Sequence, residues 1–163
     1  MNNMKYRPAE ISDETEILSI YHSNIGLPGC TWDDDYPSTE TIKYDISVDS
    51  LHCMTDDENS LIAVASLGKF DELDDLSCWD KSVRNWCDLM RIGVRSDLHG
   101  QGYGSMILDY IIKQAVKENF DGMRIIVSKT NPKALGMYHK FNFKHCGETN
   151  KFDIDWYCYE LKL

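Results

Sequence analysis

One run of residues constrains the fold of this chain more than any other. An apolar strand pattern over residues 88–94 is followed by the glycine-rich segment His99-Gly100-Gln101-Gly102-Tyr103-Gly104, and apolar residues then recur at helical spacing through residues 103–115. In such a strand, loop and helix succession, backbone N–H groups of the loop can point at an anion held at the helix N-terminus. The run therefore predicts a pyrophosphate site.

The glycine spacing separates this loop from two common nucleotide-binding loops. No glycine lies three residues after Gly102, as a dinucleotide fingerprint requires, and the lysine and hydroxyl residue of a nucleoside triphosphate loop are absent. On the glycines alone, a tight turn without a ligand remains an alternative.

Two motifs add a family to this interpretation. The segment Arg91-Ile92-Gly93-Val94, leading into the glycine loop, resembles the acyl-CoA-binding motif of the GNAT superfamily of N-acetyltransferases, with Gly102 and Gly104 in the expected places and His99 where Arg or Gln is usual. Residues 131–143 resemble the second motif of that family, with Asn142 in place of its usual glycine, a substitution that a residue tolerant of left-handed backbone permits.

The resemblance implies a set of site residues. Acetyl-CoA is the implied cofactor, and the implied cofactor-binding residues are Ile92, Gly93, Val94, His99, Gly100, Gln101, Gly102, Tyr103, Gly104, Ser105, Asn131, Lys133 and Tyr138. No metal site is predicted.

The patterns along the whole chain agree with one α/β (α+β) domain over residues 1–163. We expect strands at 5–8, 50–54, 61–67, 88–94, 122–128, 143–146 and 154–161, and helices beginning near Ser12, after the cap Ser38, after the glycine loop and at Asn131. Residues 69–86 are expected to form a long loop that could serve as a lid. The resemblance implies a GNAT-like, mixed and mostly antiparallel twisted sheet of about seven strands with about four helices.

Acetylation of an amine sets three chemical requirements. An alkylammonium must lose a proton, at a cost of about 4 to 5 kcal/mol at neutral pH; Asp88 is the candidate base, with a solvated strand-end aspartate as the alternative. The N–H of Ile92 is implied to stabilise the oxyanion. Tyr138 is the candidate general acid for the leaving thiolate, with a plain core aromatic as the alternative.

The acceptor side is predicted from one acidic and aromatic loop. Trp32, Asp33, Asp34, Asp35 and Tyr36 can hold an ammonium through cation–π and charge contacts, and the net charge of −10 favours a cation. A surface loop anchored by Trp32 is the alternative.

Composition argues against several other classes of protein. The acidic charge and the lack of a basic run argue against nucleic acid, and no apolar stretch or leader indicates a membrane span or secretion, so we expect a cytoplasmic protein with six reduced cysteines, monomeric or homodimeric. The predicted function is acetyl transfer from acetyl-CoA to a primary amine of a small molecule or peptide through a ternary complex. A non-catalytic acyl-CoA-binding or regulatory module and a protein lysine or N-terminal acetyltransferase remain alternatives.

Overall fold

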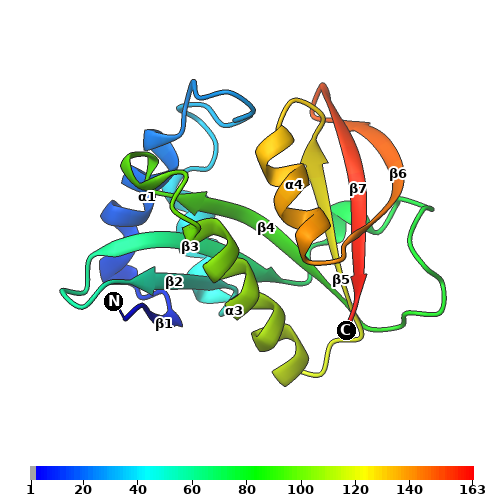
Figure 1. Cartoon of the computed structure of the whole chain (residues 1–163), viewed down its shortest axis with the longest axis horizontal. Coiled ribbons are helices and arrows are strands. Elements are labelled where there is room, and N and C mark those ends of the chain that lie inside the picture. Colours follow the sequence, from blue (N-terminus) through cyan, green and yellow to red (C-terminus); the bar gives the residue numbers. More distant parts are fainter. Residues whose placement is uncertain (1–2) are drawn as a thin grey trace.

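A computed structural model describes residues 3–163 and shows one seven-stranded sheet with the strand order β1-β2-β3-β4-β5-β7-β6 (Figure 1). Neighbouring strands are antiparallel except β4 and β5, which are parallel. The sheet is thus mixed and mostly antiparallel, as predicted. The strands are β1 (Lys5–Pro8), β2 (Leu51–Thr55), β3 (Leu61–Gly68), β4 (Trp86–Val94), β5 (Gly122–Ser128), β6 (Lys144–Lys151) and β7 (Ile154–Lys162).

Four α-helices cover the two faces of the sheet: α1 (Glu14–Ser23), α2 (Thr39–Ser47), α3 (Tyr103–Lys117) and α4 (Pro132–Lys140). In Figure 1, α3 and α4 lie in front of the sheet and α1 lies behind it. Short 3-10 turns occupy Ile11–Asp13, Asp71–Leu73 and Ser96–Leu98. Among residues 3–163, no helix is long and apolar enough to cross a bilayer.

Local sequence explains where the helices begin. Ser38 caps α2 by accepting a hydrogen bond from the Thr41 N–H, and Pro132 occupies the first turn of α4, where its missing N–H costs nothing. The first helix begins later than predicted: α1 starts at Glu14, because a 3-10 turn with a Glu10 and Asp13 capping box comes first. Asn142 has a φ of 67°, the left-handed backbone that the sequence predicted there.

Two apolar clusters hold the layers together. In front of the sheet, α3 and α4 contribute Ile107, Ile111 and Tyr138 to a buried cluster that includes Leu89 of β4. Behind it, Ile17 and Tyr21 of α1 and Ile42 of α2 pack on Leu51 and Val64. Strand β3 carries side chains into both layers, because Ala63 and Ala65 lie in the front cluster and Val64 lies in the rear one.

The long loop of residues 69–85 packs on the sheet. Its Leu73 and Trp79 are buried in a small cluster with Cys158 of β7, and the Trp79 Nε1 donates to the Leu73 carbonyl at 2.8 Å. Three ion pairs tie the loop to neighbouring strands: Asp74 with Arg124, Asp75 with Lys151, and Asp80 with Lys162. These anchors leave the loop closed against β7 and β6.

Candidate functional site

The two parallel strands at the centre of the sheet separate along their length. Pairing between β4 and β5 is confined to Trp86 with Gly122, Cys87 with Met123, and Asp88 with Arg124. From Leu89 onward β4 has no β5 partner, and the far half of β5 pairs only with β7 (Figure 1). Backbone N–H and C=O groups that a continuous sheet would use are therefore left for a ligand between the strands.

We call the space between the separating strands β4 and β5 the wedge. Strand β4 contains a bulge where the wedge opens. Met90 pairs with Ser66 and Gly93 with Val64, so Arg91 and Ile92 together stand opposite Ala65. Arg91 has a φ of 53°, which is rare for a residue other than glycine. Ile92 and Val94 pack on the α3–α4 side of the sheet, whereas Gly93 faces Ile20, Tyr21 and Trp32 on the α1 side. At the wedge, β4 therefore contacts the helices on both faces of the sheet.

The glycine loop ends beside this wedge, at the start of α3. Gly100 and Gly102 have φ values of 79° and 87°, and a Cβ at either position would meet nothing within 4 Å. Glycine is thus required for the backbone while the space above the loop stays open. The first helical hydrogen bond of α3 runs from the Met106 N–H to the Gly102 carbonyl, and no side chain caps the helix.

The N–H groups of Tyr103, Gly104 and Ser105 precede that first bond and lack helical partners. Together with the helix dipole these donors could hold an anion such as a pyrophosphate, and the space over the glycines is open. The Cα of Gly104 also lies close to α4, because a Cβ there would be 3.4 Å from the Met137 sulfur.

The other predicted cofactor residues lie in the glycine loop or at the start of α4. The exposed His99 donates from Nε2 to the Val94 carbonyl at 3.0 Å, so its ring fastens the loop to the end of β4. Gln101 and Lys133 are exposed. Asn131 caps α4 by accepting from the Ala134 N–H at 3.2 Å. The carbonyl oxygen of its amide is therefore committed to the helix.

Tyr138 lies inside the α3–α4 cluster. Its side chain is 3% exposed and stands edge-on to Phe143 with ring centroids 5.3 Å apart. Burial raises the pKa of its hydroxyl. The group therefore keeps its proton at all ordinary pH values, as a general acid must before it acts.

Asp88 does not meet the requirements of a base in this structure. Its carboxylate is fully buried, accepts from Arg124 Nε at 2.6 Å and Nη2 at 3.0 Å, and accepts from the Phe70 N–H at 2.9 Å. It also lies at the paired end of β4, before the strands separate. An amine cannot approach an oxygen that is closed in this way, which corrects the expectation from sequence.

The acidic loop is divided in its roles. Trp32 packs edge-on against Tyr21 at 5.1 Å, and Asp33 uses Oδ1 to accept from the N–H groups of Asp35 and Tyr36. Asp34 and Asp35 are exposed, and the Tyr36 hydroxyl accepts from Arg91 Nη1 at 2.9 Å. Trp32 and Asp33 therefore stabilise the conformation of the loop, and the carboxylates of Asp34 and Asp35 are exposed to solvent.

The segment just before the acidic loop, at Gly29, reaches α4. A Cβ on Gly29 would lie 2.9 Å from the Asn131 Cα, so this segment passes directly over the N-terminus of α4. Thr31 lines a cavity of about 510 Å³ with residues from the end of β5 and the β6–β7 turn. The other lining residues are Ser128, Lys129, Thr130, Asp153, Ile154 and Asp155.

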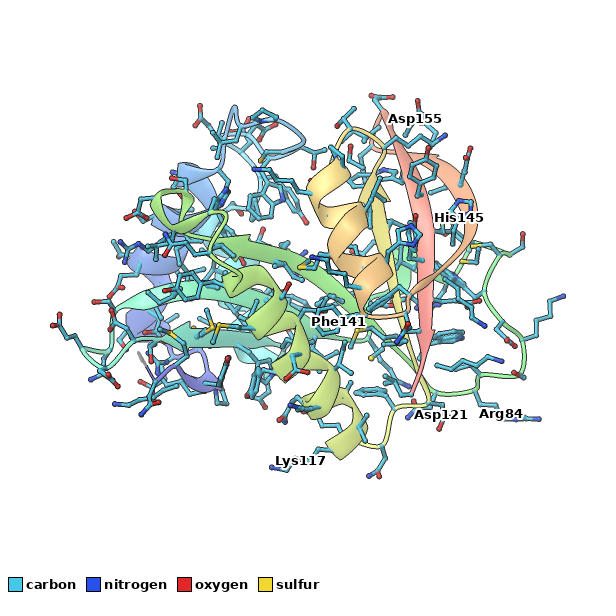
Figure 2. All side chains as sticks on the ribbon, viewed as in Figure 1. Arg84, Lys117, Asp121, Phe141, His145 and Asp155 are labelled. Carbon is cyan, nitrogen blue, oxygen red and sulfur yellow. The ribbon has the colours of Figure 1, made fainter. Side chains whose placement is uncertain are left out.

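The sequence did not predict this cavity. Figure 2 shows Asp155 at the end of the sheet where β5 stops and α4 begins. A signal was present, because Ser128 and Thr130 flank the carboxyl end of a buried parallel strand, a common position for ligand-binding residues. Among residues 3–163, no three His, Cys, Asp or Glu side chains are arranged to hold a metal ion.

The Acetyltransferase (GNAT) family profile matches residues 16–143, and the chain therefore belongs to this family. The resemblance drawn from the two motifs is confirmed. Acetyl-CoA is the acetyl donor of the family, in agreement with the predicted cofactor. None of the curated protein sequences matches the chain.

Solved structures share the fold. A GNAT family acetyltransferase of Streptococcus agalactiae is 17% identical with a TM-score of 0.82, over 98% of this chain and 95% of that one. An N-acetyltransferase of Staphylococcus aureus is 22% identical with a TM-score of 0.76, over 98% of each chain. A Salmonella typhimurium protein solved with its cofactor acetyl-CoA is 19% identical with a TM-score of 0.76, over 99% of this chain and 94% of that one.

Proposed function

We propose that this protein transfers the acetyl group of acetyl-CoA to the primary amine of a small molecule or peptide, with both substrates bound at once. The observation that carries the proposal is the wedge between β4 and β5, which opens beside the uncapped start of α3. Such a wedge gives an extended ligand free backbone groups along its length and an anion site at its end.

The cofactor supplies an activated acetyl thioester, and the protein supplies the groups that hold and polarise it. The N–H groups of Tyr103, Gly104 and Ser105 hold the pyrophosphate. The N–H of Ile92, at the bulge, donates to the carbonyl oxygen as negative charge develops there. Tyr138 gives its proton to the departing sulfur.

The amine reaches the wedge from the side of the acidic loop. Asp34 and Asp35 attract an ammonium, and Asp153 and Asp155 extend the acidic surface to the cavity beside Thr31. A cation is favoured because the chain as a whole carries a net charge of −10. With Asp88 closed off, the proton of the ammonium leaves through water.

Measurement of CoA release with a panel of amines tests the proposal. We expect steady release that depends on the amine, with one acetylated product formed per CoA. Tight binding of acetyl-CoA without amine-dependent release would instead identify a non-catalytic acyl-CoA-binding module. Release only with a protein or peptide amine would identify a protein acetyltransferase.

A further inference from the structure

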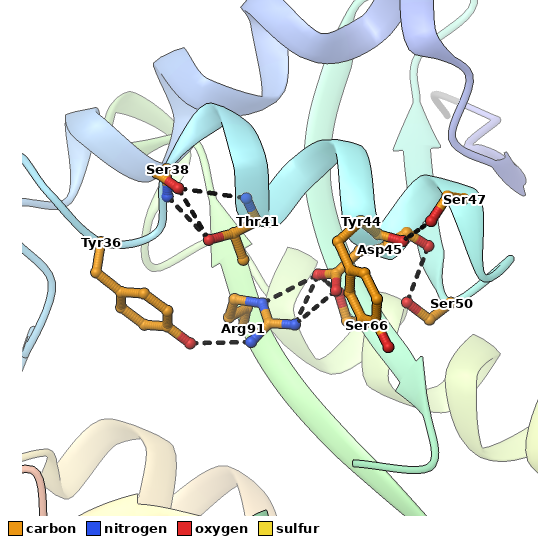
Figure 3. Close-up of polar contacts among 9 residues, drawn as sticks. All are labelled: Tyr36, Ser38, Thr41, Tyr44, Asp45, Ser47, Ser50, Ser66 and Arg91. Carbon is orange, nitrogen blue, oxygen red and sulfur yellow. Dashed lines mark hydrogen bonds and ion pairs between the residues drawn. The ribbon is translucent and has the colours of Figure 1, made fainter.

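Arg91 of β4 hydrogen-bonds to side chains from two other segments, Asp45 and Tyr36, at the bulge (Figure 3). Asp45 of α2 accepts from Arg91 Nε at 3.1 Å and from Nη2 at 2.7 and 2.9 Å. Ser66 of β3 donates to the same carboxylate at 2.9 Å. Arg91 Nη1 donates to the hydroxyl of Tyr36 at 2.9 Å. We name the group Asp45, Arg91 and Tyr36 the bulge brace.

The brace is fixed in place by burial. The side chains of Arg91 and Asp45 are 7% and 1% exposed, and the guanidinium also lies over the Phe70 ring at 5.4 Å. A buried ion pair is a poor source of net stability, because desolvating both charges offsets their attraction. Its forked geometry, however, allows very little freedom to the arginine.

Arg91 directly precedes Ile92, so its fixed side chain bears on the direction of the Ile92 N–H. The N–H of Ile92 belongs to the rigid peptide unit that begins at the Arg91 carbonyl, so the backbone angles of Arg91 set its direction. Arg91 has a φ of 53°, an unfavourable value for a residue with a Cβ. Something must hold this residue in that conformation, and the brace is attached to its side chain.

We propose that Asp45 and Tyr36 are positioning residues that act through Arg91 to aim the Ile92 N–H at the thioester carbonyl. The inference rests on the proposed function, in which that N–H polarises the carbonyl. Because Tyr36 belongs to the acidic loop, the brace also joins the segment that receives the amine to the segment that activates the acetyl group.

A pair of variants separates positioning from simple stabilisation. Both Arg91→Ala and Arg91→Gly remove the guanidinium and differ only in the Cβ, but glycine adopts a positive φ freely. Both are made with Asp45→Asn, so that no unpaired carboxylate stays buried. If the brace holds the backbone of Arg91, the alanine variant loses kcat and the carbonyl hydrogen bond, and the glycine variant recovers both.

Two measurements report on the thioester carbonyl of acetyl-CoA. Infrared spectra of bound acetyl-CoA labelled with ¹³C at the carbonyl report the hydrogen bond, and kcat at saturating substrates reports its use. We expect the wild-type band to lie at lower wavenumber than that of free acetyl-CoA, to move back toward the free value with alanine, and to return with glycine. We expect kcat to fall about 10- to 100-fold with alanine and to recover about tenfold with glycine, while the Kd for acetyl-CoA changes about twofold or less.

The outcomes are distinguishable. If the wild type binds acetyl-CoA and releases CoA with an amine, but the alanine and glycine variants share one carbonyl band and one kcat, the brace only stabilises the fold and the inference is wrong. If the wild type binds no acetyl-CoA, or releases no CoA with any amine, the proposed function fails first and the inference fails with it.

The Tyr36 arm has its own matched control. Tyr36→Phe removes the hydroxyl that receives Arg91 Nη1, whereas Tyr44→Phe removes one from an exposed tyrosine of α2, whose side chain makes no hydrogen bond to the described residues (Figure 3). We expect Tyr36→Phe to lower kcat about threefold to tenfold and shift the carbonyl band, and Tyr44→Phe to change neither. Identical results for the two variants would remove Tyr36 from the brace.

Discussion

The guanidinium of Arg124 on β5 closes over the carboxylate of Asp88 on β4, with Nε 2.6 Å from Oδ1 and Nη2 3.0 Å from Oδ2. The pair joins the two strands at the last residues where they are still hydrogen-bonded, immediately before they separate. The pair therefore links the two strands at the place where the wedge begins.

Asp88→Asn should destabilise the protein without removing a base. Loss of one partner leaves Arg124 largely buried with only Asp74 as a counter-ion, so we expect the free energy of unfolding in urea to fall by about 3 kcal/mol. The dependence of kcat/KM on pH should keep its shape and follow the pKa of the amine used. Loss of the rising limb on the acid side of that profile, with stability unchanged, would restore Asp88 as the base.

Gly102→Val should weaken acetyl-CoA binding at least tenfold, because the side chain would enter the open space above the N-terminus of α3. Gly26→Val is the matched control: Gly26 also has a positive φ, of 82°, and its Cβ would also meet nothing within 4 Å. Both variants should lose about 1–2 kcal/mol of stability from backbone strain. Calorimetric titration that found equal acetyl-CoA affinity in both variants would move the pyrophosphate elsewhere.

Tyr138→Phe should lower kcat about 100-fold and change either KM little, because it removes a proton donor needed late in the reaction. Burial raises the pKa of Tyr138, so its ionisation should not reduce kcat at any pH below 10 in the wild type. Steady-state kinetics over that pH range check both points. An unchanged kcat in the phenylalanine variant would leave Tyr138 as a core aromatic.

Asp34→Asn with Asp35→Asn should raise the KM of a cationic amine about threefold at low salt and reduce its dependence on salt. The KM of acetyl-CoA should not change, because the two exposed carboxylates lie on the acceptor loop. Asp33 is left intact because its side chain holds the turn of that loop. An amine KM that does not respond at low salt would make the loop a solvated surface.

His52 should make the protein less stable in mild acid. Its side chain is buried, its Nδ1 lies 3.2 Å from the Tyr110 hydroxyl, and burial lowers its pKa below the usual 6.5. The unfolded chain therefore binds a proton before the folded chain does, and stability present above pH 6.5 is lost as the pH falls toward the folded pKa. We expect the free energy of unfolding in urea to fall between pH 7 and 5, and to fall less in His52→Gln. Equal slopes in both proteins would assign the effect to other groups.

Local patterns in the sequence predicted most of the elements. The Ser38 cap, the proline in the first turn of α4 and the left-handed Asn142 all depend on residues close in sequence, and each is observed. The edge strand β6 extends further than predicted, to Lys151, because its added residues are polar and give no apolar alternation. Polar edge residues are common where a strand faces solvent.

The contacts that shape the site were beyond local patterns. Asp45 and Arg91 are 46 residues apart in sequence, and Asp88 and Arg124 are 36 apart. No residue close to Asp88 in sequence indicates a buried ion-pair partner. A solvent-exposed carboxylate at a strand end and a buried, paired one therefore have the same local sequence pattern. The bulge at Arg91 likewise depends on the register between β3 and β4.

A crystal structure with CoA and an amine acceptor bound tests the central claim most directly. We expect the pyrophosphate over Gly100, Gly102 and the first N–H groups of α3, the pantetheine between β4 and β5, and the Tyr138 hydroxyl within hydrogen-bond reach of the sulfur. We expect the amine on the side of Asp34 and Asp35. CoA bound outside the wedge, or Tyr138 turned away from the sulfur, would contradict it.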